Sequence, residues 1–369
     1  MDRRLWMLAD FDVATSCGIE IGALTTPIVG RGEGEIIYVD HTDTESLRRK
    51  YRDHTAVDVR RIVEVDAVWG GNTLQQAIGV DRKVDYVLAC HVIEHVPDLI
   101  GWLQEVKAVL RPGGTLRLIV PDRRFTFDRL RRETRLADIV FAQMVATRIP
   151  LAPMLLDHIL EVASVDAMAA WRGEIDDDAL TRMHTLQMAI DVAQDATRNG
   201  TYHDVHCWVF TAETFAALMA RAASLGLIGY ECVDFHDTET GDIEFFVALR
   251  PCDDADAAAA SWRRMVDALR AVASTPLAAH DAAPAAEALS DALARVSTER
   301  DDAVARLPAL EGRAAAVLDA LARVSAERDA ALAMVAALQR STSWRITRPL
   351  RALAMAARRT ARGAIMARD

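Results

Sequence analysis

The stretch Gly18-Ile-Glu-Ile-Gly-Ala-Leu-Thr-Thr-Pro27 decides the fold, because a second segment, Leu110-Arg-Pro-Gly-Gly114, completes the pattern that it begins. The first segment contains a short apolar strand followed by a glycine, which lets the backbone pass close to a bound ligand. The second is the turn between a helix and another strand, with glycine supplying a positive φ. Strand-like and helical runs alternate through the first 250 residues. This alternation predicts a parallel sheet with helices on both faces.

Runs of β-forming residues bounded by turn residues give the positions of the expected strands. These are residues 17–21, 36–40, 62–66, 86–89, 115–120, 230–235 and 243–249. Helices are expected at 45–51, 99–110 and 212–225, where apolar residues recur at helical spacing. Residues 123–210 are mostly helical in pattern and too long for a plain connection, so they predict a helical cap or insertion. The last two strands are expected to form a hairpin that closes the sheet.

Composition limits the class of protein. The chain has 369 residues, 51% of them apolar, and a net charge of −11. No apolar run approaches the ~18–20 residues needed to cross a bilayer, and the N-terminus does not resemble a secretory signal. Five scattered cysteines without a CxxC pair predict neither a disulfide framework nor a zinc site. We therefore expect a cytoplasmic protein that does not bind nucleic acid.

The C-terminal third has a different organisation. Residues 1–252 form the first predicted domain, and the Ala- and Asp-rich residues 253–288 are interpreted as a linker. The sequence of 291–301 then recurs at 319–329, an offset of four heptads. Thirteen of the fifteen a and d positions of 289–340 are apolar, which predicts a coiled coil and hence a homo-oligomer. The alternative is one amphipathic helix folded back on the first domain.

The last segment, 341–369, is basic. It carries seven arginines and one acidic residue, so the rest of the chain sums to −17. Pro349 suits the first turn of a helix, and Trp344 precedes that turn. A basic amphipathic helix is typical of binding to an anionic membrane surface. The sequence predicts peripheral attachment at the inner membrane through this tail.

Three acidic residues stand where strands are expected to end or just before a turn. Glu20 lies two residues before Gly22, and Asp40 ends the second expected strand. A carboxylate at the end of the second strand can accept both ribose hydroxyl protons, so Asp40 is the candidate ribose ligand. Asp66, at the end of the third expected strand, is the analogous candidate for an adenine amino group. The alternative for Asp40 is an ordinary turn residue.

Together with 84–96 and 110–114, these segments resemble the type-11 branch of the class I S-adenosylmethionine-dependent methyltransferases. The resemblance spans about residues 15–125, with Leu24 at the second glycine of the family's E-x-G-x-G motif. It implies a Rossmann-like α/β fold with a seven-stranded sheet and S-adenosylmethionine as cofactor, and it places some residues along that cofactor. The predicted cofactor-binding residues are Glu20, Gly22, Ala23, Asp40, Asp66, Cys90 and His91.

Methyl transfer to a hydroxyl needs alignment and a base. His206 is the preferred base, since histidine titrates near the working pH, with His203 and Asp122 as further catalytic candidates. A metal site formed by His203, Asp204 and His206 is a less favoured interpretation. The candidate substrate-binding residues are Arg123, Arg124 and Asp128. Each of these has a structural alternative as a loop, cap or solvated helix residue.

The tail resembles the C-termini of bacterial enzymes that assemble surface polysaccharides. This resemblance implies O-methylation of a sugar hydroxyl, with a saccharide or glycolipid as acceptor. Two alternatives remain. The first is methylation of a small metabolite such as a quinone or phenol, and the second is a catalytically degenerate fold that serves as a coiled-coil scaffold. Leu24 supports the scaffold, whereas Asp40 and the Glu94-His95 pair argue against it.

Overall fold

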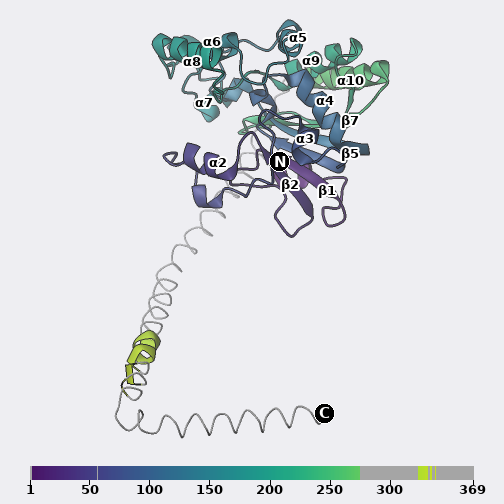
Figure 1. Ribbon diagram of the computed structural model, residues 1–369. Coiled ribbons are helices and arrows are strands. Elements are labelled where there is room, and N and C mark those ends of the chain that lie inside the picture. Colours follow the sequence, from purple (N-terminus) through teal and green to yellow (C-terminus); the bar gives the residue numbers. More distant parts are fainter. Residues whose placement is uncertain (1, 56, 275–322, 331–332, 335–336, 338–369) are drawn as a thin grey trace, which may run out of the picture. The chain divides into compact units, whose positions relative to one another are not determined.

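A computed structural model describes residues 2–55, 57–274, 323–330, 333–334 and 337. The chain divides into two compact units, Met1–Pro276 and Leu277–Asp369. The first unit contains the sheet and the helices that cover it (Figure 1). Among the described residues, no helix is long and apolar enough to span a membrane.

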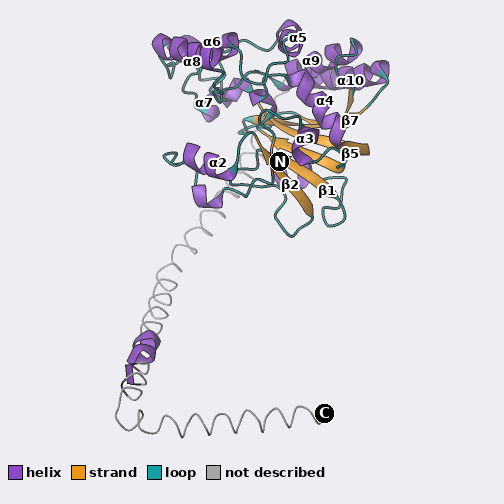
Figure 2. Ribbon diagram, viewed as in Figure 1, coloured by secondary structure: helices purple, strands orange, loops and turns teal. Residues whose placement is uncertain are grey.

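A seven-stranded sheet forms the centre of the first unit (Figure 2). Its strands are β1 (Cys17–Ile21), β2 (Glu35–Asp40), β3 (Ala67–Val68), β4 (Val84–Cys90), β5 (Leu110–Pro121), β6 (Tyr230–His236) and β7 (Glu244–Pro251). The order across the sheet is β3-β2-β1-β4-β5-β7-β6. The first five strands pair in parallel, and β7 pairs antiparallel with both β5 and β6. The chain order reverses between β1 and β4, and at such a point the carboxyl ends of parallel strands open a crevice for ligands.

The helices are short, apart from α4 and the last three. Their bounds are α1 (Arg3–Met7), α2 (Thr44–Lys50), α3 (Leu74–Ile78), α4 (Leu99–Val109), α5 (Leu136–Met144), α6 (Ala152–Glu161), α7 (Ala167–Trp171), α8 (Leu186–Asn199), α9 (Ala212–Ser224) and α10 (Ala255–Ser274). Short 3-10 turns occur at η1 (Val59–Arg61), η2 (Ile93–His95), η3 (Arg123–Phe125) and η4 (Asp177–Ala179). Helices α6, α7 and α8 lie together beyond the strands, as the cap predicted for 123–210 requires (Figure 1).

Six of the seven expected strands and all three expected helices are confirmed within two residues, except that β5 begins five residues early. Val84 pairs with Leu110 and Tyr86 with Thr115, so residues 111–114 bulge out of the ladder. The expected turn is therefore a bulge at the start of β5, and Gly113 adopts the predicted positive φ of 83°.

The strand expected at 62–66 is wrong. Strand β3 comprises Ala67 and Val68 and begins directly after Asp66. Residues 63–66 alternate apolar and polar side chains as a strand would, but η1 precedes this segment, and pairing with β2 begins only at Ala67. Because the strand begins later than expected, Asp66 lies just before the first residue of β3 and not at its carboxyl end.

The linker expected from residue 253 is instead the long helix α10, which packs against α9 and β6. Trp262 is fully buried, and its indole N–H donates to the carbonyl oxygen of Tyr230 at 2.9 Å. One face of this alanine-rich helix is apolar and buried. It consists of Ala258, Ala259, Trp262 and Val266. The first unit therefore continues through this helix.

The second unit is described only in part. Residues 323–330 are helical, as the coiled coil predicts for that stretch, and Val324 at a d position is exposed. The remainder of the predicted coil and the whole of the basic tail at 341–369 lie outside the described residues. The coiled coil, the oligomer and the membrane contact stay predictions.

Candidate active site

A pocket of about 1020 Å³ opens at the carboxyl ends of β1, β2, β3 and β4. The strand ends supply one part of its lining, residues 20–24, 40–42, 69–71 and 90–92. Further lining comes from Arg3 of α1, from α2, from 95–98 and the start of α4, and from two segments of the cap, 146–149 and 202–204. Ligand pockets usually measure about 300–1,000 Å³, so this one has room for more than one small molecule.

The loop after β1 keeps a ligand-binding backbone despite its missing glycine. Gly22 has a φ of 70°, and Leu24 has a φ of 45°, the left-handed conformation that glycine adopts most easily. The carbonyl oxygen of Leu24 accepts a hydrogen bond from the Val63 N–H at 2.9 Å. Leu24 therefore adopts a left-handed conformation although it is not glycine. Both residues line the pocket together with Ala23.

Glu20 is buried at the base of this loop. Its carboxylate accepts hydrogen bonds from the backbone N–H groups of Ile28 and Val29 at 2.7 and 3.1 Å. Burial raises the pKa of Glu20 to about 7, although these two hydrogen bonds and Arg4 oppose the shift. The carboxyl group shapes the loop and also lines the pocket.

Asp40 ends β2 and is almost completely buried in the pocket wall. One carboxylate oxygen, Oδ1, accepts the backbone N–H of His41 at 2.7 Å and lies 2.6 Å from Nδ1 of the same histidine. The other oxygen has no recorded partner among the described residues. A carboxylate fixed in this way at the end of the second strand can accept hydroxyl protons from a ribose.

Asp66 does not line the pocket, which corrects its prediction as an adenine ligand. Its carboxylate accepts the Tyr38 N–H at 2.9 Å and pairs with Arg31 at 2.8 Å. Because β3 begins after Asp66, the strand delivers Trp69 and Gly70 to the pocket instead. The indole N–H of Trp69 donates to Glu105 at 2.8 Å.

Cys90 and His91 follow β4 and line the pocket, as predicted. His91 has a φ of 52°, and its Nε2 lies 2.7 Å from a carboxylate oxygen of the buried Glu244. Arg3 binds the same carboxylate. Burial raises the pKa of the Cys90 thiol, so this cysteine stays protonated.

Sequence reasoning missed Arg3 and Glu244. Arg3 lines the pocket from α1, 241 residues away from its partner Glu244. The one available signal was Glu244 itself, an acidic residue that opens an otherwise apolar strand. Contacts over this distance are set by the sheet order, which places β7 beside β5.

One wall of the pocket consists of Tyr202, His203 and Asp204. Asp204 pairs with Lys50 at 2.6 Å and accepts from the Tyr202 hydroxyl at 3.2 Å. Burial favours a higher pKa for Asp204, but His95 and Lys50 outweigh it and hold that pKa below its usual range. His203 Nε2 lies 2.8 Å from Asp195 of α8, which orients the imidazole.

His206 is placed behind this wall and does not line the pocket. It is buried, and its Nδ1 lies 2.5 Å from an oxygen of Asp128. Arg131 also binds Asp128, at 2.8 Å. Burial opposes ionisation of Asp128, but His206 and Arg131 lower its pKa to about 2. The structure does not place His206 and Asp128 in this pocket, where a base and a substrate ligand were predicted; they bond each other behind its wall.

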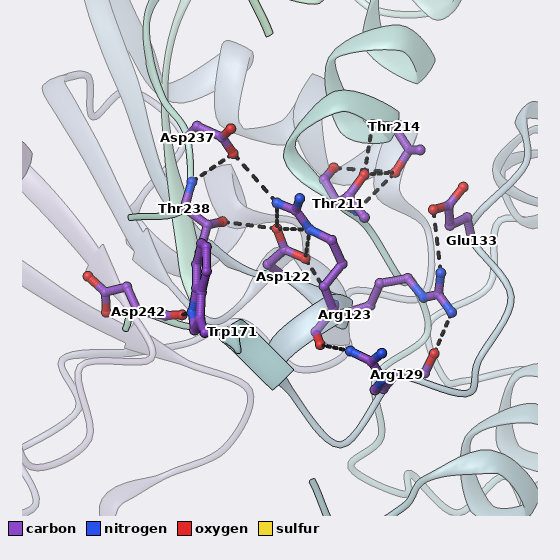
Figure 3. Close-up of polar contacts among 11 residues, drawn as sticks. Asp122, Arg123, Arg129, Glu133, Trp171, Thr211, Thr214, Asp237, Thr238 and Asp242 are labelled. Atoms are coloured by element: carbon purple, nitrogen blue, oxygen red, sulfur yellow. Dashed lines mark hydrogen bonds and ion pairs between the residues drawn. The ribbon is translucent and has the colours of Figure 1, made fainter. Parts of the chain in front are cut away.

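Asp122, Arg123 and Arg124 belong to a separate network at the end of β5 (Figure 3). Asp122 is fully buried, and its carboxylate accepts from the Thr238 hydroxyl at 2.9 Å and from the Arg124 guanidinium at 2.6 Å. Arg123 donates to the carbonyl oxygen of Arg129 and lies 3.5 Å from Glu133. These three residues do not line the pocket, so their predicted catalytic and substrate roles are corrected to structural ones.

Comparison with known protein families identifies the kind of domain. A family model described as a methyltransferase domain matches residues 29–223, more than half of the chain. No curated protein matches the sequence.

Three solved structures illustrate the likeness in three dimensions. An S-adenosylmethionine-dependent methyltransferase from Clostridium acetobutylicum is 9% identical, with 64% of this chain and 83% of that chain covered and a TM-score of 0.31. The CcbJ methyltransferase from Streptomyces caelestis is 14% identical, with 68% and 94% covered and a TM-score of 0.31. A putative methyltransferase of the same kind from Listeria monocytogenes is 12% identical, with 67% and 95% covered and a TM-score of 0.33.

Proposed function

Because this chain belongs to the methyltransferase domain family and takes S-adenosylmethionine as its cofactor, we propose that it methylates a hydroxyl group of a saccharide acceptor. The strand ends fit the cofactor. Gly22 and Leu24 keep an open left-handed loop after β1, and Asp40 offers a free carboxylate oxygen at the end of β2. The cofactor supplies an electrophilic methyl group on a sulfonium, and the chain has to align the acceptor and remove one proton.

The observation that carries this proposal is the polar wall at 202–204. It offers a phenol, an imidazole and a carboxylate in sequence, and Lys50 adds an ammonium group. A sugar presents several hydroxyls that both donate and accept hydrogen bonds, so it needs a wall of mixed donors and acceptors. The ring faces of Tyr51 and Tyr202 can cover its C–H surfaces.

Within this wall we assign to His203 the role of the general base that removes the proton of the acceptor hydroxyl. Its Nε2 is held by Asp195, which leaves Nδ1 to accept a proton from the acceptor hydroxyl. A histidine held by a carboxylate in this way is a common arrangement for a general base. This assignment replaces His206, which the Asp128 ion pair keeps behind the wall.

The proposed acceptor belongs to bacterial surface-polysaccharide assembly. Support for this context comes from the sequence of the basic tail, 341–369, which suits attachment to an anionic membrane surface on which a glycolipid acceptor would be presented. The catalytic proposal does not depend on that context, because it concerns the pocket alone.

The test incubates the purified full-length chain with methyl-labelled S-adenosylmethionine and a panel of nucleotide sugars, lipid-linked saccharides, phenols and quinols. Mass spectrometry then locates the transferred methyl group. We expect an O-methylated saccharide. Methylation of phenols or quinols alone would replace the saccharide with a small metabolite, and a folded chain that does not bind the cofactor would identify a scaffold.

The base is tested by His203→Gln, for which we expect kcat to fall by about 10²–10⁴-fold with an unchanged Kd for the cofactor. His236→Gln is the matched control, because His236 is also held by a carboxylate, Glu239 at 2.9 Å, but does not line the pocket. Equal losses in the two variants would contradict the assignment of His203.

A further inference from the structure

Glu94 is a fully buried carboxylate whose two oxygens have no hydrogen-bond partner among the described residues. It belongs to the η2 turn after β4, and its backbone carbonyl oxygen, by contrast, accepts the N–H groups of Cys207 and Trp208. A buried polar group without a partner costs free energy, and a buried charge without a counter-charge costs more. The fold thus holds a carboxylate where it needs a partner that the described residues do not provide.

The basic residues around Glu94 are committed elsewhere. Among the residues that the structure describes, the one basic group within ion-pair distance of Glu94 is His91, whose Nδ1 lies 3.6 Å from Oε1. The Nε2 of His91 is already bonded to Glu244. Lys50 pairs with Asp204, and Arg131 pairs with Asp128. No lysine or arginine of the described part of the chain is therefore recorded as neutralising Glu94.

Two histidines face the same space, and an aspartate lies close to the Nδ1 of each. His95 Nδ1 lies 2.9 Å from Asp204 Oδ1, and His206 Nδ1 lies 2.5 Å from Asp128 Oδ2. The two rings meet edge to face, with centroids 4.6 Å apart. His206 Nδ1 is bonded to Asp128, which leaves its Nε2 for a ligand, whereas His95 Nδ1 makes no hydrogen bond among the described residues. A carboxylate behind an imidazole is the usual support of a metal-bound histidine.

We propose that Glu94, His95 and His206 bind a divalent transition-metal cation of the zinc class. One ligand atom from each of the three lies within 4.8 Å of the other two. Two imidazoles and one carboxylate are a set that Zn²⁺, Co²⁺ and Fe²⁺ accept, with a fourth position open to water. Bonds of about 2.1 Å require roughly 3.4 Å between neighbouring ligand atoms, so separations of up to 4.8 Å would shorten by up to about 1.4 Å on binding.

The cation would connect two segments that build the pocket. His95 lines the pocket from the η2 turn, and His206 follows directly after the wall at 202–204. A bond from each to one ion would fix that wall against the end of β4. The inference concerns binding and order, so it does not rest on the identity of the methyl acceptor.

The experiment titrates the full-length chain, first dialysed against a chelator, with Co²⁺ and with Zn²⁺. We expect one Co²⁺ per chain with visible d–d absorption, displacement by Zn²⁺ and a rise in Tm with either ion. Glu94→Gln keeps the size of the side chain and removes its charge, so affinity should fall at least 100-fold. His95→Gln should act similarly, and cofactor binding by each variant confirms that it is folded.

His203→Gln is the control, because His203 lies on the same segment but is paired with Asp195 and is outside the cluster. It should retain the wild-type Co²⁺ spectrum. The proposal is overturned if wild-type protein takes up no Co²⁺, if Glu94→Gln binds as tightly as wild type, or if thiolate charge-transfer bands show that cysteines hold the ion. A loss in His203→Gln as large as that in Glu94→Gln would also overturn it.

Discussion

At the scale of single residues, Asp40 offers the sharpest test of the cofactor site. Asp40→Asn removes the charge that would bind the ribose hydroxyls, and a hydrogen bond to a charged group contributes about 1.5–3 kcal/mol. We expect the Kd for S-adenosylmethionine to rise by about 10- to 100-fold in isothermal calorimetry. Asp66→Asn is the matched control, since Asp66 bonds Tyr38 and Arg31 outside the pocket, and it should leave that Kd unchanged. A higher Kd for Asp66→Asn than for Asp40→Asn would instead indicate that Asp66 binds the cofactor.

Glu20 predicts a pH dependence of stability. Burial raises its folded-state pKa from 4.5 to about 7, so the unfolded chain releases this proton at lower pH. The contribution of Glu20 to stability is therefore fully present below pH 4.5 and is lost as the pH rises through 7. The shift corresponds to about 3 kcal/mol in total.

Urea unfolding of wild type and Glu20→Gln at pH 5 and pH 8 isolates the contribution of Glu20, because the other titratable groups are the same in the two proteins. The free energy of unfolding of wild type relative to the variant should fall by about 2–3 kcal/mol between the two pH values. A difference that does not change with pH would mean that Glu20 ionises normally in the folded chain.

How far the site could be predicted depends on the distance between partners in the sequence. Glu20 and Asp40 could be placed at the pocket from sequence because a strand end puts its own last residues at the sheet edge, so local pattern suffices. His206 was misjudged because its role is decided by Asp128, 78 residues away. Polar residues near a strand end look alike in sequence whether they face a pocket or a buried partner.

At the scale of elements, α10 is expected to stabilise the first unit as part of its core. Trp262→Ala removes a fully buried indole and its hydrogen bond to Tyr230, which should lower the free energy of unfolding by about 3–5 kcal/mol. Urea unfolding measures this change. Leu225→Ala, at a side chain that is 59% exposed, should shift it by no more than about 0.5 kcal/mol. A small effect of Trp262→Ala would restore the linker that the sequence suggested.

The elements themselves were largely predictable, for reasons that particular segments show. Strands β1, β2 and β4 are mostly apolar and almost fully buried, because parallel strands are covered on both faces. Strand β3 was misplaced because it has two residues and little pattern. Residues 253–288 were interpreted as a helix-leaning linker, and the packing of α10 was missed because alanine contributes so little to an apolar stripe that its buried face could not be recognised.

At the scale of the whole molecule, the heptad repeat predicts self-association through 289–340. Val324 occupies a d position and is 63% exposed, so a second copy would cover it. We expect the full-length chain to be an oligomer by light scattering, and Val324→Asp to shift it toward monomer. Ala326→Asp, at the outward f position, is the control and should keep the oligomer. A monomeric wild type would favour the alternative of a single helix folded back.

The ion pair between Arg3 and Glu244 has a practical consequence for handling the protein. Arg3 lines the pocket from the first helix and reaches a carboxylate that also holds His91. An affinity tag fused ahead of Asp2 would put foreign chain within a few residues of the ligand entrance. Purification handles and fluorescent labels therefore belong elsewhere, and a tagged preparation should be compared with a cleaved one before its activity is interpreted.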